Sequence, residues 1–139
     1  MNTIENNKKL VEILLKTVFQ KHDFSKLDEI MMDDYIQHNA DVPQGKTGFK
    51  QFFEMMFKAF PDFSYTMKKI ICEGDIVMMW STTTGTHNGM FIDNPPTGNK
   101  LSFDVVDIFR IENGKIAEHW DVADTLKLFT LVGKVKAVR

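Results

Sequence analysis

Three side chains capable of acid–base chemistry lie close together in the last third of the chain. Asp107, His119 and Asp121 interrupt two segments whose other residues are mostly apolar. An apolar surrounding raises the pKa of a carboxyl group, and its anion then becomes a stronger base near neutral pH. A neighbouring histidine can donate a proton or a hydrogen bond to a developing oxyanion. These three residues are therefore the candidate catalytic groups.

The spacing of these residues decides whether they share one face of a sheet. His119 and Asp121 are separated by one residue, so both side chains lie on the same face of any regular strand. A two-residue turn at 113–114 would place Asp107 opposite Trp120, whereas a connection one residue longer would place it opposite His119. We favour the second register, which gathers the three side chains, although both registers fit the sequence.

Other catalytic chemistry finds little support in the sequence. Neither the glycine-rich phosphate loops GxGxxG and GxxxxGK[ST] nor the nucleophile motif GxSxG occurs. The single cysteine, Cys72, excludes an intrachain disulfide and a cysteine-built zinc site. Four histidines, at positions 22, 38, 87 and 119, form no HxH or HxxxH pair. We therefore expect no metal and no cofactor.

Composition narrows the class of protein. The 139 residues suit one domain, expected to span 1–139, and 43% hydrophobic content is enough for a core. A net charge of −2 without a basic face argues against nucleic acid as a partner. Because the N-terminus is polar, we expect no signal peptide, and no apolar run reaches the roughly 20 residues of a membrane span. The expected location is cytoplasmic.

Helices precede strands along the chain. Apolar residues at helical spacing predict helices over 10–19 and 49–60, and Pro61 ends the second of these. A Ser25–Asp28 capping box predicts a short helix between them that carries Leu27, Ile30 and Met31. Two-residue alternation then predicts strands over 63–72, 76–86, 101–111 and 115–123. Thr125 is expected to cap a last helical turn, which Gly133 closes at its C-terminal cap.

This order of elements predicts an α+β fold in which a curved antiparallel sheet wraps over the N-terminal helices. Such a cone encloses a concave apolar cavity suited to a small molecule. His38 and His87 are expected at its mouth, and the segment Ile76–Trp80 is apolar in both phases, so a partner should cover the outer face. We therefore expect a homodimer. The expected apolar wall of the cavity consists of Tyr35, Phe53, Phe57 and Trp80.

The chain resembles the SnoaL-like polyketide cyclases from about residue 10 to residue 133. The resemblance rests on the segments Asp33–His38, Gly85–Phe91, Pro95–Gly98, Asp107–Ile111 and Gly114–Asp121. It implies the cystatin-like cone of the nuclear-transport-factor-2-like superfamily, usually dimeric through the outer face of the sheet. It also implies that Asp121 is the acid–base residue of an intramolecular aldol cyclisation, that Asp107 is a polar pocket residue, and that His38 and His87 line the pocket.

Three functions remain open at this stage. The first is a cofactor-independent cyclase or isomerase that acts on a carbonyl-containing apolar substrate, with Asp121 as base and His119 or His87 as donor. The second is a hydrolase or dehydratase on the same fold. The third is a non-catalytic binder of small apolar ligands, for which the same cavity is sufficient.

Overall fold

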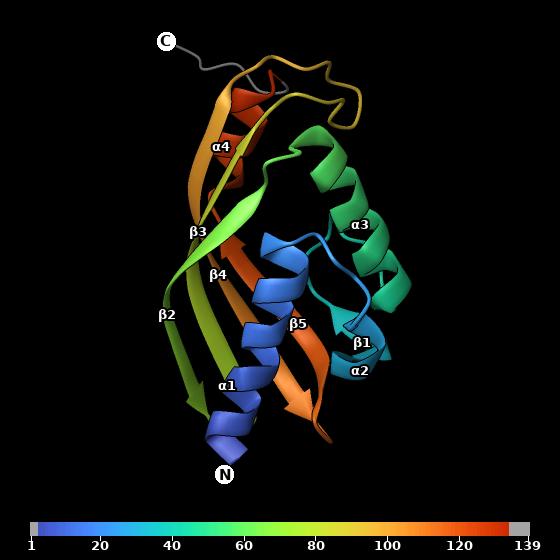
Figure 1. The fold of residues 1–139 in the computed structure, drawn as a ribbon, viewed down its shortest axis with the longest axis vertical. Coiled ribbons are helices and arrows are strands. Elements are labelled where there is room, and N and C mark those ends of the chain that lie inside the picture. The colour runs from blue at the N-terminus through green and yellow to red at the C-terminus, as the bar shows by residue number, and fades with distance from the viewer. Residues whose placement is uncertain (1–2, 134–139) are drawn as a thin grey trace.

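The computed structural model describes residues 3–133, and they form a curved five-stranded sheet with helices packed on its concave side (Figure 1). The chain starts with α1 (Thr3–Leu14), which continues as a π-helical segment over Leu15–Gln20. Next come α2 (Leu27–Ile30), β1 (Met31–Gln37) and α3 (Gly45–Ala59). The remaining elements are β2 (Ser64–Glu73), β3 (Ile76–Thr86), β4 (Lys100–Glu112), β5 (Lys115–Ala123) and α4 (Thr125–Leu131).

The predicted α+β class and the wrapped sheet are confirmed, with one addition. The strand order is β1-β5-β4-β3-β2, and β1 pairs with β5 in parallel, whereas the other neighbours are antiparallel. From the sequence, Met31 was predicted at the end of a helix, and no strand was predicted there. The segment MMDDYIQ carries no strand pattern, because its buried and exposed residues do not alternate regularly. Strand β1 lies at the edge of the sheet and pairs only with β5. Its conformation therefore depends more on its hydrogen bonds to β5 than on the preferences of its own side chains.

Two predicted helix caps are wrong. The short helix α2 begins after Lys26 without a side-chain cap, because the backbone N–H of Ser25 instead donates to Asp23 Oδ1 at 2.9 Å. The last helix is capped by Asp124, whose side chain accepts a hydrogen bond from the Lys127 backbone, rather than by Thr125. Gly133 does follow this helix with a left-handed φ of +85°, as a C-terminal glycine should.

The core lies between the concave face of the sheet and the helices. The predicted phenylalanine face of α3 is buried there, and the helix ends at Ala59, directly before the Phe60-Pro61 pair. Strands β3 and β4 bury every second residue, so one face belongs to the core and the other faces outward. This alternation determines which polar residues enter the interior. No helix among residues 3–133 combines the length and the apolar character needed to cross a lipid bilayer.

Candidate active site

The β4–β5 hairpin carries all three candidate catalytic residues. Asn113 and Gly114 both adopt positive φ, +50° and +74°, as a tight two-residue turn requires, and Ile111 pairs with Ile116. A bulge in β5 then shifts the register by one residue, and Asp107 lies directly opposite Asp121. Our favoured three-residue connection is therefore wrong, because the turn is short and the extra residue sits inside β5.

Because of the bulge, the side chains of Asp107, His119 and Asp121 lie close together, as the favoured register had predicted. His119 Nε2 lies 2.8 Å from Asp107 Oδ1, and both residues are buried, with 5% and 2% of their surface exposed. Asp121 follows on the same face and lines the same cavity. Asp107 Oδ2 is buried and has no hydrogen-bond partner among the described residues. The arrangement is a buried carboxyl–imidazole pair with a second carboxylate beside it.

Two amides at the end of the unexpected strand β1 and just after it complete the site. Gln37 Oε1 lies 2.9 Å from His119 Nδ1, and Asn39 Nδ2 donates to both oxygens of Asp121 at 3.1 and 3.3 Å. Gln37 and Asn39 were not predicted from the sequence, because their contacts depend on the parallel pairing of β1 with β5. The one signal that pointed here was the Asp33–His38 segment of the family resemblance.

Burial raises the pKa values of two groups in the site, Asp107 and Tyr65. The pKa of the Asp107 carboxyl is raised above its ordinary value of 3.8, chiefly because burial penalises its anion. The hydrogen bond and the charge of His119 oppose this shift, while the negative charge of Asp121 adds to it. Burial also raises the pKa of the Tyr65 hydroxyl, which lines the same cavity and stays protonated. Asp107 therefore holds a proton more readily than an exposed carboxyl group does.

The raised pKa of Asp107 predicts a pH-dependent stability difference. A carboxyl group with a higher pKa in the folded state stabilises the fold fully below its unfolded pKa, and this contribution is lost as pH rises through the folded pKa. The stability of the wild type relative to Asp107→Asn should therefore fall as pH rises above about 4. Urea unfolding of both proteins between about pH 4 and pH 8 measures this difference, and a constant or rising difference would contradict the burial argument.

The polar trio of Asp107, His119 and Asp121 lines a small cavity whose wall is otherwise mostly apolar. The volume of this cavity is about 70 Å³. Apolar side chains make up most of the remaining wall: Val42, Phe52, Phe53, Met56, Phe63, Phe103, Val105, Ala123 and Leu128. Only a small chemical group fits beside the carboxylates.

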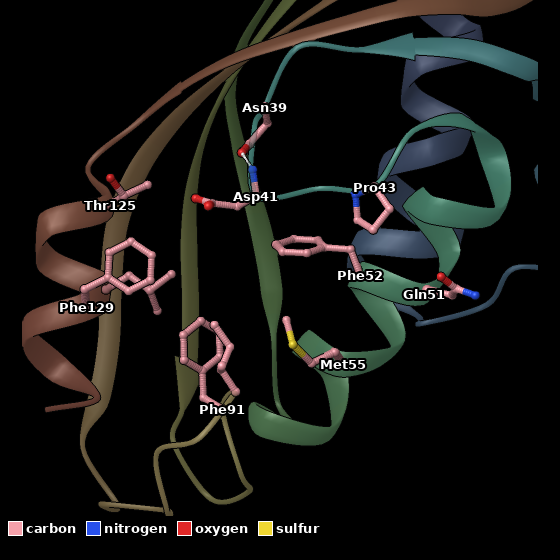
Figure 2. Close-up of a pocket in the computed structure, with 11 residues that line it drawn as sticks. Asn39, Asp41, Pro43, Gln51, Phe52, Met55, Phe91, Thr125 and Phe129 are labelled. Atoms are coloured by element: carbon pink, nitrogen blue, oxygen red, sulfur yellow. Dashed lines mark hydrogen bonds between the residues drawn. The ribbon is translucent and has the colours of Figure 1, made fainter. Parts of the chain in front are cut away.

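A larger pocket of about 340 Å³ adjoins this inner cavity (Figure 2). Phe52 and Met55 of α3 face Thr125 and Phe129 of α4 across it, and Phe91 of the loop after β3 forms another part of the wall. The outer pocket and the inner cavity share four lining residues, Asn39, Phe52, Thr125 and Leu128. A ligand seated in the outer pocket would thus lie next to the polar trio.

Of the predicted pocket residues, Phe53 lines the inner cavity. Tyr35 and Phe57 are buried in the core behind it: Tyr35 Oη accepts from Gln37 Nε2 at 2.7 Å, and Phe57 stacks on His22 at 3.8 Å. Neither contributes to the walls of the two pockets. These two aromatic rings therefore support the site from outside it.

The other three predicted pocket residues lie away from both pockets. Trp80 is on the outer face of β3, where its indole donates to Asp104 at 2.9 Å. His38 stacks on Trp120 at 4.7 Å and bonds Glu118, which is also on the outer face. His87 is fully buried next to Phe60, with Nδ1 accepting from the Thr97 backbone N–H. His87 therefore anchors the loop after β3.

The polar trio also has spacing compatible with a metal ion. Ligand atoms of Asp107, His119 and Asp121 all lie within 4.8 Å of one another. In the hydrogen-bonded arrangement both His119 ring nitrogens have partners, Asp107 and Gln37. A cation would have to replace the bond between His119 and Asp107.

Comparison with known proteins places the chain in a family. The family model of the SnoaL-like polyketide cyclases matches residues 9–130, most of the chain. The chain belongs to the SnoaL-like polyketide cyclase family. The resemblance noted in the sequence is thereby confirmed. No curated protein sequence matches the chain significantly.

Solved structures of three Streptomyces proteins share the whole fold. TsrD from Streptomyces laurentii is 27% identical, with a TM-score of 0.85 and coverage of 97% of this chain and 99% of TsrD. AclR from Streptomyces galilaeus is 29% identical, with a TM-score of 0.85 and coverage of 99% and 87%. IdmH from Streptomyces antibioticus is 26% identical, with a TM-score of 0.76 and coverage of 91% and 98%.

Proposed function

We propose that this SnoaL-like protein is a cofactor-independent acid–base enzyme that cyclises or isomerises a carbonyl-containing, mostly apolar small molecule. The observation that carries the proposal is the placement of Asp121 beside the buried Asp107–His119 pair, at the polar end of an apolar cavity. Asp121 removes a proton next to the substrate carbonyl. The Asp107–His119 pair supplies a proton to the oxygen on which negative charge develops.

The division of roles follows from the partners of the two carboxylates. Asp121 accepts hydrogen bonds from the Asn39 amide on both oxygens. Asp107 is fully buried, shares a proton with His119, and has a raised pKa. A carboxyl group that already holds a shared proton is suited to act as the acid, which leaves the neighbouring carboxyl group to act as the base.

The electrostatics of the walls indicate an uncharged substrate. Among the described residues, neither pocket is lined by lysine or arginine, so no basic side chain there would pair with a carboxylate or phosphate. The inner cavity is large enough for a carbonyl and its neighbouring carbon, while the outer pocket accommodates an apolar ring system. This substrate agrees with the description of IdmH as a candidate polyketide cyclase.

Proton exchange at carbon tests the proposed base without knowledge of the natural substrate. Uncharged aryl ketones and β-diketones are incubated with the protein in D₂O, and deuterium uptake next to the carbonyl is followed by proton NMR. We expect the protein to accelerate uptake by about 10²–10⁴-fold for the compounds that bind, the usual contribution of a positioned base. Asp34→Asn, which changes an exposed carboxylate on β1, serves as the control and should exchange at the wild-type rate.

The same experiment separates the alternative functions. Binding without any accelerated exchange across the panel would contradict the proposal and favour a binder of small apolar ligands. Hydrolytic cleavage of a β-diketone without exchange at carbon would favour a hydrolase, and loss of water from a β-hydroxy ketone added to the panel would favour a dehydratase. AclR, described as a candidate hydroxylase, illustrates that relatives with this fold are assigned to different chemistry.

We also propose that the protein is a homodimer through the outer face of the sheet. Two adjacent rungs of β3, β4 and β5 place apolar side chains side by side on that face: Met78, Trp80, Val106, Ile108, Trp120 and Val122. Trp80 and Val122 are 44% and 68% exposed. A contiguous apolar surface of this kind favours a second copy of the chain, because a two-fold axis brings the same patch onto itself.

Placing a charge in this patch should separate the dimer. Val122→Lys would bury an unpaired ammonium group on each side of the interface, so dimer dissociation should become easier by roughly a hundredfold or more. Analytical ultracentrifugation should then show a 16.1 kDa monomer where the wild type has twice that mass. Thr84→Lys, at an exposed position of β3 beyond the patch, is the matched control. A wild-type monomer at micromolar concentration would contradict the dimer.

A further inference from the structure

The hydrogen bonds around Gln37 determine the orientation of its amide. Its side-chain oxygen faces the backbone N–H of Asn39 at 3.1 Å, and that N–H can only donate. Its side-chain nitrogen donates to the Tyr35 hydroxyl at 2.7 Å. The contact with the Asn39 N–H requires the oxygen of the amide to point toward Asn39 and His119, and the Tyr35 hydroxyl, which can accept or donate, fits this orientation. The orientation is thus defined by partners outside the imidazole.

This orientation defines the tautomer of His119. Nδ1 lies 2.9 Å from the Gln37 oxygen, an atom that can only accept, so Nδ1 must carry a proton. Nε2 lies 2.8 Å from Asp107 Oδ1, and that contact needs one further proton between the two atoms. The proton is located either on the ring, as imidazolium beside carboxylate, or on Asp107, as carboxylic acid beside neutral imidazole. The net charge of the pair is the same in both cases.

We propose that Gln37 is a positioning residue that fixes His119 in the form protonated at Nδ1 and thereby keeps a transferable proton between His119 and Asp107. Without its oxygen, a neutral ring would move its proton to Nε2 and donate it to the Asp107 carboxylate. The pair would then contain one proton fewer, and two carboxylate charges would face the cavity. The use of this proton in catalysis rests on the function proposed above, but the tautomer does not.

Gln37 is itself held firmly enough for this role. It is 4% exposed, and in the parallel β1–β5 pairing it lies next to His119. Gln44 braces its backbone from the other side: Gln44 Oε1 accepts from the Gln37 N–H at 3.0 Å, and Gln44 Nε2 donates to the Gln37 carbonyl at 2.6 Å. The position of the amide therefore does not depend on the ring that it orients.

Nitrogen NMR of the histidine rings tests this inference without a substrate. Protein labelled with ¹⁵N-histidine is studied at neutral pH by long-range proton–nitrogen correlation, and the His119 signals are assigned by their loss in His119→Asn. We expect the wild-type Nδ1 to resonate as a protonated nitrogen. In Gln37→Met, which keeps the length of the side chain and removes the acceptor, the ratio of Nδ1-protonated to Nε2-protonated rings should fall about tenfold or more. Gln37→Glu retains an acceptor and should retain the proton at Nδ1.

Controls separate this role from general disturbance of the site. Gln44→Met removes two hydrogen bonds to the same backbone but leaves the Gln37 oxygen, so Nδ1 should stay protonated. A wild-type Nδ1 without a proton would overturn the proposal even if Gln37→Met failed to fold. An Nδ1 that stays protonated in folded Gln37→Met, or one that loses its proton equally in Gln44→Met, would also overturn it. None of these spectra depends on Asp121 acting as a base, so failure here is distinguishable from failure of the proposed function.

Discussion

Replacement of Phe53 by alanine is expected to lower the free energy of unfolding by about 3–5 kcal/mol, the usual cost of removing a buried aromatic ring. Phe53 is 8% exposed and forms the centre of the aromatic core between α3 and the sheet. Its ring centroid lies 4.7–6.3 Å from those of five other rings, Phe19, Phe49, Phe52, Phe57 and Phe63. The cavity created by the substitution cannot easily be filled, because these neighbours also pack against one another.

Urea unfolding followed by circular dichroism measures this loss. Phe24→Ala is the matched control, because Phe24 is only partly buried at the edge of the same cluster and contacts Phe57. We expect a smaller loss for the control. If the two substitutions cost the same, the helix face that carries Phe53 does not form the centre of the core.

Substitution of Asp121 by asparagine should lower turnover by about 10²–10⁴-fold once a substrate is known, while ligand affinity changes little. Asparagine has nearly the same shape as aspartate and can still contact the Asn39 amide, but it cannot accept a proton from carbon. The defect should therefore appear in kcat, with KM almost unchanged. Steady-state kinetics together with equilibrium binding of the same ligand separates these two quantities.

Asp107→Asn provides the informative comparison. It removes the carboxyl group that shares a proton with His119, whereas Asp121 keeps its own contacts with Asn39. If Asp107→Asn abolished turnover and Asp121→Asn left it intact, the two carboxyl groups would have to exchange the roles of acid and base. If neither substitution affected turnover, the chemistry would have to take place elsewhere.

The fold was largely predictable because its strongest elements have strong local patterns. The apolar face of α3 and the alternation along β3 and β4 each follow from side-chain spacing alone, and the structure buries the predicted residues. Strand β1 was not predictable in this way. Its conformation depends on a parallel neighbour more than 80 positions later in the chain, and single-sequence patterns contain no information about such pairing.

The same distinction applies to the candidate site. His119 and Asp121 could be placed on one face because an i, i+2 spacing survives any register. The partners Gln37 and Asn39 could not be found, because they approach through β1. Trp80 was predicted to line the pocket, but strand parity places it outward, next to Asp104. Composition indicates which side chains are apolar, whereas register determines which face they occupy.

The bulge in β5 lets the hairpin lose one residue without changing the site. Ile116 and Ala117 are both buried, so the strand holds one residue more than a regular ladder from the turn would pair. Removal of Ala117 would leave a ladder without a bulge, in which His119 and Asp121 keep their present partners and Asp107 stays opposite Asp121. One residue inserted between Ala117 and Glu118, with the single bulge retained, would instead place Trp120 opposite Asp107 and turn His119 and Asp121 to the outer face. We therefore expect this hairpin to tolerate a deletion at the bulge and not an insertion after it.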